Sequence, residues 1–299
     1  MATLSVILNG FLLSYDALGK SVYSNEGGRV GTKANSVLQA DEEVLFVPLS
    51  FNPGIQLETT VFRPKGRGPF PLVVMNHGKA FMAPAQQPRA RYPVLSQEFV
   101  RRGYVVVIPM RQGFSQSGGS YAAPGCDLVA NGREQARDVD AVIRHFQKKS
   151  WIKSDQVLVI GQSHGGLVTM ALAERAAPGV QLLVNFAGGL RSNGGRCKSQ
   201  WQEQMVLAFQ RFGEGTPLPS VWFYGQNDGF FSPTLVKRMH AAYLGSNPKG
   251  TASARLVAFG PFGQDSHGMV EYSGGVGLWW PELEPELKRL GFPLTVRRD

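Results

Sequence analysis

The feature that most constrains this chain is an apolar run of strand length that ends in a serine flanked by glycines. Residues 156–160 read Gln-Val-Leu-Val-Ile and lead directly into Gly161-Gln162-Ser163-His164-Gly165-Gly166. An amphipathic stretch begins at Leu167. This order predicts a buried strand, a sharp turn with Ser163 at its apex, and a helix. The two flanking glycines avoid collisions in the turn, and the helix N-terminus favours negative charge beside the serine.

Apolar runs of strand length alternate with helical patterns along most of the chain. The alternation predicts an α/β fold with a mostly parallel, doubly wound sheet of about eight strands, whose functional site lies at the carboxyl ends of the strands. The first two strands are expected to be antiparallel and joined by a turn at Asn52-Pro53-Gly54. The expected strands are residues 43–49, 56–62, 71–76, 104–109, 156–160, 181–186, 220–224 and 254–259, and the expected helices besides the one after Ser163 are residues 93–102, 133–149, 200–212, 233–243 and 281–290.

Composition and loop length predict the domain organisation. Residues 1–40 are irregular and rich in Gly, Ser and Asn, so we expect an N-terminal arm that could begin with a helix, followed by one domain at 41–299. The connection at about 190–217 is too long for a plain link between a strand and a helix. We therefore predict a small cap insert there.

Ser163 needs a base and an orienting acid before its hydroxyl can act as a nucleophile. Three histidines follow it in the chain. His164 belongs to the turn itself and His240 lies within an expected helix, whereas His267 lies in the loop after the last strand, where a catalytic base belongs. We predict His267 as the base.

The acid is expected after the second strand that follows the serine strand. Asp228 stands there, at the end of Tyr224-Gly225-Gln226-Asn227-Asp228. Asp265 is the alternative, but it lies only two residues from His267, so the two side chains could not easily share one short hydrogen bond. We predict Asp228.

An oxyanion intermediate would need two N–H donors. The first is expected from the backbone of His164, the residue after the nucleophile. The second is expected from Lys79, because Gly78 before it allows the backbone to approach closely. The ring of His77 is expected to brace this loop rather than to transfer protons.

Four motifs occur in one order along the chain: Asn76-His77-Gly78, the Ser163 motif, the segment ending at Asp228, and Ser266-His267-Gly268. With them, residues 55–290 resemble an α/β-hydrolase of the dienelactone hydrolase and prolyl oligopeptidase catalytic-domain type. The loop of residues 111–119 also resembles the corresponding loop of those enzymes. The resemblance implies an α/β-hydrolase fold with the small cap insert and a serine-hydrolase mechanism, but no particular substrate.

Two positions depart from the family pattern. Ser163 stands where dienelactone hydrolases resemble one another in using Cys, so lactone specificity is not carried over. Lys79 replaces the second glycine that often follows His-Gly, which places a cation near the mouth of the site. Because Arg111 also follows a strand end, we predict Gly78 and Arg111 as substrate-binding residues and a preference for esters with a carboxylate or phenolic group. The alternative is that Arg111 only braces its own loop.

The sequence leaves three candidate functions open for this chain. The first is a carboxylic ester hydrolase that acts on small molecules through an acyl-enzyme and needs no cofactor or metal. The second is a peptidase or amidase, although prolyl oligopeptidase-like enzymes usually carry a large propeller domain for which this chain has no room. The third is a binding protein or effector on a hydrolase scaffold, which an intact Ser-Asp-His set disfavours.

Composition excludes other classes of protein. The net charge is +9, but the basic residues are scattered and no nucleic-acid-binding motif occurs, so we expect no nucleic-acid partner. No apolar run reaches the length of a membrane span, and residues 1–20 make a poor signal peptide. The sequence does not determine an oligomeric state.

The two cysteines, Cys126 and Cys197, form no C-x-x-C pair, so the sequence contains no zinc or redox motif of that kind. Both lie in segments that start at the carboxyl ends of strands, on the rim that holds Ser163. We predict a disulfide between them, which would close a loop of about 70 residues. A disulfide would imply a periplasmic or secreted protein, whereas two free thiols would imply a cytoplasmic one.

Overall fold

The computed structural model describes residues 7–8, 11–12, 14–15, 21–22, 41–122, 125–175, 178–191, 197–214, 216–246 and 253–297. Within the N-terminal arm, four two-residue strands form two antiparallel pairs: β1 (Ile7–Leu8) with β2 (Phe11–Leu12), and β3 (Ser14–Tyr15) with β4 (Ser21–Val22). The helix that could begin the arm is contradicted at residues 7–8, which are extended. The other residues of the arm lie outside the described part.

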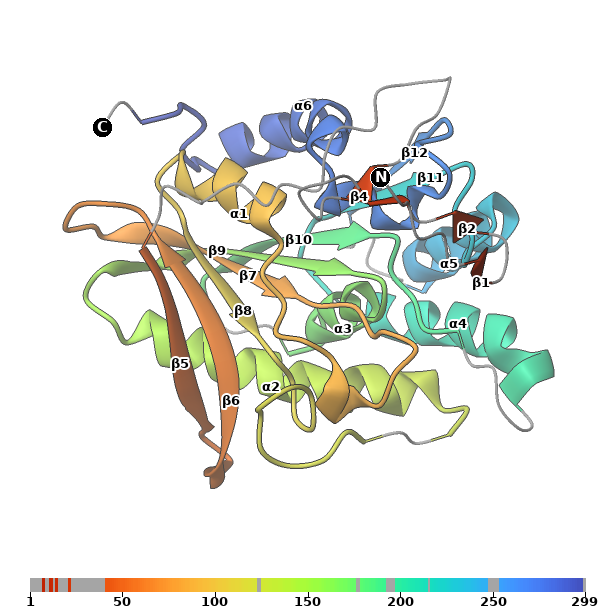
Figure 1. The fold of residues 1–299 in the computed structure, drawn as a ribbon, viewed down its shortest axis with the longest axis horizontal. Helices are drawn as coiled ribbons and strands as arrows, with labels where there is room; N and C mark the ends of the chain where they lie inside the picture. Colours follow the sequence, from red (N-terminus) through yellow and green to blue (C-terminus); the bar gives the residue numbers. More distant parts are fainter. Residues whose placement is uncertain are drawn as a thin grey trace, which may run out of the picture.

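An eight-stranded sheet forms the centre of the molecule (Figure 1), and its strand order is β5-β6-β8-β7-β9-β10-β11-β12. Strand β6 is antiparallel to β5 and β8, and every neighbouring pair from β8 to β12 is parallel. This topology confirms the predicted mostly parallel sheet. The strands are β5 (Asp41–Leu49), β6 (Asn52–Arg63), β7 (Phe70–Asn76), β8 (Val105–Pro109), β9 (Ile152–Gln162), β10 (Val180–Phe186), β11 (Ser220–Gly225) and β12 (Ala254–Phe259).

Helices cover both faces of the sheet, and each face has its own apolar core. Helices α1 (Pro93–Val100) and α6 (Ser273–Arg289) pack on one face. The other face carries α2 (Leu128–Gln147), α3 (His164–Leu172), α4 (Cys197–Gly213) and α5 (Pro233–Gly245). Two short 3-10 helices, η1 (Pro84–Gln86) and η2 (Ser266–Glu271), lie in loops.

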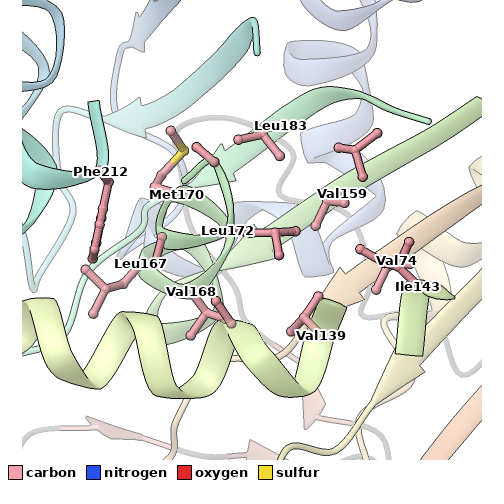
Figure 2. Packing of buried hydrophobic residues seen from close by; sticks show 14 of the residues in the cluster. Val74, Val139, Ile143, Val159, Leu167, Val168, Met170, Leu172, Leu183 and Phe212 are labelled. Carbon is pink, nitrogen blue, oxygen red and sulfur yellow. The ribbon is translucent and has the colours of Figure 1, made fainter. Parts of the chain in front are cut away.

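Helix α3, which begins directly after Ser163, is the most enclosed of these helices. All nine of its residues are buried. Figure 2 shows Val168 beside helix α2, Leu167 next to Phe212, and Leu172 near Val159 of strand β9. Close packing on all sides leaves the helix little freedom to shift, so its N-terminus is held in place beside the sheet.

Several element boundaries differ from those we predicted, and three of the differences are described here. Helix α2 begins five residues before Arg133, because the Asp127 carboxylate caps it by accepting a hydrogen bond from the Ala130 N–H at 2.8 Å. Helix α6 begins at Ser273 and contains Pro281 and Pro285 in its interior. The first hairpin turns at residues 50–51, and Asn52 already pairs with Leu49 in the ladder.

The region predicted as a cap insert contains helix α4. The second half of this helix buries Met205, Phe209 and Phe212 in the helical layer, and the Phe209 ring lies 4.9 Å from that of Trp222 in β11. That half is therefore an ordinary layer helix. The boundaries of the domain and of the insert stay predictions.

Candidate active site

Ser163 occupies a strained turn between strand β9 and helix α3. Its φ and ψ are 54° and −124°, a backbone conformation that is unfavourable for a residue with a side chain. A side chain at Gly161 would collide with the carbonyl of Gly165, and one at Gly165 would collide with the carbonyl of Asn76. The predicted strand, turn and helix are confirmed, and the two glycines stand where this turn requires them.

His267 and Asp228 form a hydrogen-bonded pair across two loops. The Nδ1 atom of His267 lies 3.1 Å from each carboxylate oxygen of Asp228. The Asp228 side chain is fully buried, and its Oδ1 also accepts hydrogen bonds from the N–H groups of Phe230 at 2.8 Å and Phe231 at 3.0 Å. Charged acceptors hold N–H donors strongly, so this carboxylate fixes both the orientation and the Nδ1–H tautomer of the His267 ring.

The two alternatives considered for this pair lie elsewhere. The Asp265 carboxylate accepts hydrogen bonds from the backbone N–H groups of Gly229 at 3.0 Å and His267 at 2.9 Å, so it joins the two loops without touching the ring. His240 lies on α5, where its Nε2 donates to the Ala254 carbonyl at 2.9 Å. Both side chains therefore have structural partners.

The loops after β7, β9 and β12 meet at Ser163. The Gln162 side chain donates from Nε2 to the His267 carbonyl at 3.1 Å, and its Oε1 accepts from the Tyr92 hydroxyl at 3.3 Å. A methyl group built on Gly78 would lie 3.3 Å from the Cβ of Ser163 and 2.6 Å from the Oε1 of Gln162. A side chain at position 78 would displace the Gln162 amide from these contacts, so glycine suits the close approach of this loop to Ser163.

Two backbone N–H groups near Ser163 suit an oxyanion. Among the described residues, the N–H groups of Lys79 and His164 have no hydrogen-bond acceptor, whereas the N–H of Gly78 donates to the Tyr92 hydroxyl at 3.1 Å. His164 is also the first residue of α3, where the helix dipole favours an anion. The arrangement is compatible with the predicted donor pair.

Arg111 does not reach the rim of the site, where we predicted that it would bind substrate. It is completely buried. Its guanidinium donates from Nη1 to the His77 carbonyl at 2.9 Å, from Nε to the Gln135 Oε1 at 3.1 Å, and from Nη2 to the His164 Nδ1 at 3.1 Å. Burial lowers the pKa of Arg111 to about 10, so the side chain remains a cation at neutral pH. The prediction that Arg111 binds substrate is wrong.

His77 and His164 are the two buried histidines that Arg111 contacts. The His164 Nε2 donates to the Asn131 Oδ1 at 2.7 Å, and the His77 Nδ1 donates to the Gly78 carbonyl at 2.7 Å. The pKa values of His77 and His164 lie well below the usual range for histidine. Burial is the largest cause, and the charge of Arg111 is the second. Both rings are therefore neutral braces, as we expected for His77.

Lys79 keeps its side chain close to the protein. Its Nζ lies 3.4 Å from the Ala80 carbonyl and 5.8 Å from the centre of the Tyr121 ring. Tyr121 in turn packs edge-on against His164, with ring centres 5.9 Å apart. Of the two cations that we predicted near the mouth, Lys79 is the one that is not fully buried. Its ammonium group lies over the Tyr121 ring.

Sequence reasoning missed several residues of this site. Tyr92 has a positive φ of 42° and carries the hydroxyl that joins Gly78 to Gln162, but no local pattern marks it. Asn131 was missed because the predicted helix began two residues after it. A correct capping assignment at Asp127 would have placed Asn131 and Gln135 on the same helix face, one turn apart.

A disulfide joins Cys126 to Cys197, which confirms the predicted pairing, and their Cα atoms are 5.1 Å apart. It ties the residue before the α2 cap to the first residue of α4. Asn131, which holds His164, lies in the first turns of the α2 segment fixed in this way.

The described residues contain neither a cluster of metal ligands nor a membrane-spanning helix. No group of three or more His, Cys, Asp or Glu side chains has the arrangement of a metal site. No helix in this part of the chain is long and apolar enough to cross a membrane.

The overall architecture is similar to that of several solved hydrolases. An esterase of Pyrococcus furiosus, Pf2001, matches with a TM-score of 0.60 and 15% identity, over 86% of this chain and 94% of that one. A putative dienelactone hydrolase from Klebsiella pneumoniae matches with a TM-score of 0.57 and 17% identity, over 82% and 97%. A puromycin-hydrolyzing peptidase of Mycobacterium tuberculosis matches with a TM-score of 0.61 and 17% identity, over 87% of this chain and 41% of that one.

These identities establish the α/β-hydrolase fold and no more. No curated protein sequence matches the chain significantly. A family model, however, that of the X-Pro dipeptidyl-peptidases (S15 family), matches residues 53–208, which is more than half of the chain. The matched region runs from strand β6 to helix α4 and includes the Ser163 turn. The chain therefore belongs to the X-Pro dipeptidyl-peptidase (S15) family and is a hydrolase of the α/β-hydrolase type.

Proposed function

We propose that the protein is a serine hydrolase that cleaves carboxylic esters of small molecules through an acyl-enzyme intermediate. Ser163 Oγ attacks the ester carbonyl carbon while His267 Nε2 takes the hydroxyl proton. The oxyanion that forms accepts hydrogen bonds from the N–H groups of His164 and Lys79. The bond to the leaving alcohol then breaks as His267 returns the proton to the alcohol oxygen.

The second half of the reaction restores the enzyme. A water molecule gives its proton to His267 and attacks the acyl carbon, and the Ser163 Oγ leaves as His267 protonates it. The carboxylic acid product carries the oxygen of that water. No cofactor takes part in this scheme.

The observation that carries the proposal is the hydrogen-bonded pair of Asp228 and His267. Both carboxylate oxygens lie 3.1 Å from the His267 Nδ1, which leaves the Nε2 as the free basic atom of the ring. Gln162 binds the His267 carbonyl, so the base is tied to the residue directly before Ser163. A base, an orienting acid and a strained serine therefore belong to one connected set of loops.

Family membership favours a second candidate, a peptidase that releases X-Pro dipeptides. Such an enzyme has to bind a protonated amino terminus near its serine, which calls for a carboxylate. Asp265 is occupied by two backbone N–H groups, whereas Glu271, four residues after His267, lies close enough to Tyr92 to add to the effect of burial in raising the pKa of that hydroxyl and is the carboxylate for such a role. The Lys79 cation disfavours a protonated amino terminus at its side of the site, which favours esters. Of the two cations that we predicted near the mouth, Arg111 is buried, so the predicted preference for anionic esters now rests on Lys79.

The test compares Ser163→Ala with the unmodified protein on p-nitrophenyl esters of graded acyl length and on Ala-Pro-p-nitroanilide. We expect ester hydrolysis that falls by about 10⁴- to 10⁶-fold in the variant, because the catalytic residues act as a unit. Release of nitroaniline from the dipeptide at the same enzyme concentration would favour the peptidase. Failure of a fluorophosphonate probe to label Ser163 would favour a binding protein without catalysis.

We also infer that the protein folds in an oxidising compartment, either the periplasm or outside the cell. The support is the disulfide between Cys126 and Cys197, since such bonds are rare in reducing compartments. A non-reducing gel of protein taken from cell fractions tests this. A reduced protein confined to the cytoplasm would contradict it.

A further inference from the structure

A row of aromatic rings starts beside His267, and its phenylalanines have no part in the mechanism described above. The ring centre of Phe230 lies 4.2 Å from that of His267, and the ring centre of Phe81 lies 5.7 Å from that of Phe230, with an angle of 21° between the planes. The ring centre of Phe231 lies 5.6 Å from that of His267. The row therefore extends from the proposed base to the surface.

Phe81, the outer ring of the row, is 82% exposed. It lies two residues after Lys79, the proposed oxyanion donor, and its neighbour Met82 is also exposed. A lone exposed Phe is common on protein surfaces and means little. Here the exposed ring continues a stack that begins at the catalytic histidine, so the apolar surface borders the position where an ester would react.

The backbone of Phe230, which carries the inner ring of the row, is fixed in place. Its N–H donates to the Asp228 Oδ1 at 2.8 Å, so this residue is tied to the carboxylate that orients His267. Its ring packs between the rings of His267 and Phe81.

We propose that Phe81 and Phe230 form a subsite for a flat aromatic group on the alcohol side of the ester. The proposal rests on the ester-cleaving function proposed above. His267 protonates the leaving oxygen, so the alcohol group lies next to the ring that Phe230 covers. An aromatic alcohol then packs against Phe81 in an offset stack. The substrate class is therefore esters of benzyl-type or phenolic alcohols.

The experiment compares two esters with the same acid and similar alcohol reactivity, benzyl butyrate and cyclohexylmethyl butyrate. Both alcohols have one six-membered carbon ring, but only benzyl alcohol is flat. For the wild type we expect kcat/KM to be higher on the benzyl ester. In Phe81→Ala and Phe81→Leu we expect the benzyl preference to fall by about three- to tenfold, the range of a single aromatic pair. Leucine keeps the apolar contact without the stacking, so a loss in both variants identifies the ring.

Phe46→Ala is the matched control, because Phe46 is 51% exposed and lies on the edge strand β5. We expect it to leave the benzyl preference unchanged. Since Phe81 is almost entirely exposed, its variants should fold. An equal fall on both esters in Phe81→Ala, or the same change in Phe46→Ala, would overturn the subsite.

A binding measurement separates failure of the subsite from failure of the proposed function. Ser163→Ala protein is titrated with benzyl alcohol and with cyclohexylmethanol, with and without Phe81→Ala, and binding is followed by ligand-detected NMR. Weaker binding of benzyl alcohol after the Phe81 change supports the subsite even if the wild type cleaves no ester, which would refute only the function. Equal binding refutes the subsite. If the wild type were a dimer in gel filtration and the Phe81→Ala variant a monomer, the ring would instead form an interface with a second copy of the chain, and the subsite would be refuted.

Discussion

His164 follows Ser163 directly and His267 lies in the loop that Gln162 binds, and the two rings differ in burial and in charged partners. His267 is partly accessible and faces the Asp228 carboxylate at 3.1 Å. His164 is completely buried and accepts a hydrogen bond from the Arg111 cation. Burial and the Arg111 cation lower the pKa of His164 and keep its ring neutral, whereas the Asp228 carboxylate orients the His267 ring through its Nδ1. The surroundings, and not the residue type, therefore make one ring a candidate base and the other a brace.

The same contrast divides the site into two regions. The proposed acid–base side consists of Asp228 and His267, which lie in the loops after β11 and β12. The proposed oxyanion side consists of Lys79 and His164, and Arg111 donates to the His164 ring and to the carbonyl of His77, two residues before Lys79. The oxyanion side is fixed by buried hydrogen bonds and by the disulfide, so changes there should affect stability together with turnover. Changes on the acid–base side should affect turnover almost alone.

The largest effect is expected on the acid–base side. Asp228→Asn should lower kcat by about 10⁴-fold, because the amide can orient the His267 ring in the wrong tautomer. The matched control is Asp265→Asn, whose carboxylate binds only backbone N–H groups and which should cost much less. Steady-state kinetics on a p-nitrophenyl ester measure both. If Asp265→Asn were the more damaging change, our choice of acid would be wrong.

The second effect concerns stability on the oxyanion side. Replacing Cys126 and Cys197 by serine should lower the free energy of unfolding by up to about 4 kcal/mol, since the disulfide closes a loop of 71 residues. Urea unfolding with and without a reductant measures the loss, and the variant should not respond to reductant. Titration of the unfolded, unreduced wild type should find no reactive thiol. Two thiols would contradict the bond.

The third effect tests whether Arg111 positions the oxyanion donors. Arg111→Met removes the hydrogen bonds to the His77 carbonyl and to the His164 ring, and it should lower kcat by about 10²- to 10³-fold with little change in KM, as for loss of an oxyanion donor. Arg111→Lys should recover only part of the loss, because an ammonium group lacks the planar fork.

The control for Arg111 is Arg137→Met, which removes a half-exposed arginine paired with Glu134 on helix α2. It should leave both kinetic constants unchanged. A purely structural role for Arg111 would show as a lower melting temperature and less active enzyme, with the kcat of the remaining active sites intact. Active-site titration with a fluorophosphonate distinguishes the two cases.

The smallest effect is the dependence of stability on pH. The pKa values of His77 and His164 are lowered in the native state, so below about pH 6.5 the unfolded chain binds protons that the native protein does not. Stability contributed by these rings is therefore complete above about pH 6.5 and falls as the pH decreases toward the native pKa values. His164→Gln should reduce that slope between pH 6.5 and 4.5 in urea unfolding experiments. An unchanged slope would mean that His164 is not a buried neutral ring.

Local patterns were sufficient for most of the fold. Each strand of the sheet was predicted within a few residues, apart from the extensions of β6 and β9 toward their N-termini, because a buried parallel strand needs an uninterrupted apolar run. The boundaries that failed depended on single residues. Asp127 starts helix α2 early through a cap, and Pro281 was read as a helix start although it lies inside α6.

The sequence by itself determined the Ser163 turn, the order of the motifs and the pairing of the only two cysteines, because each follows from adjacent residues or from a lack of alternatives. Only the tertiary structure decided the environment of Arg111, which follows a strand end like Lys79 but turns inward to three buried acceptors. It also decided that Phe81 stacks on Phe230, which is far away in the chain. Burial and charge partners come from segments remote in sequence, and these set the pKa and the role of each side chain.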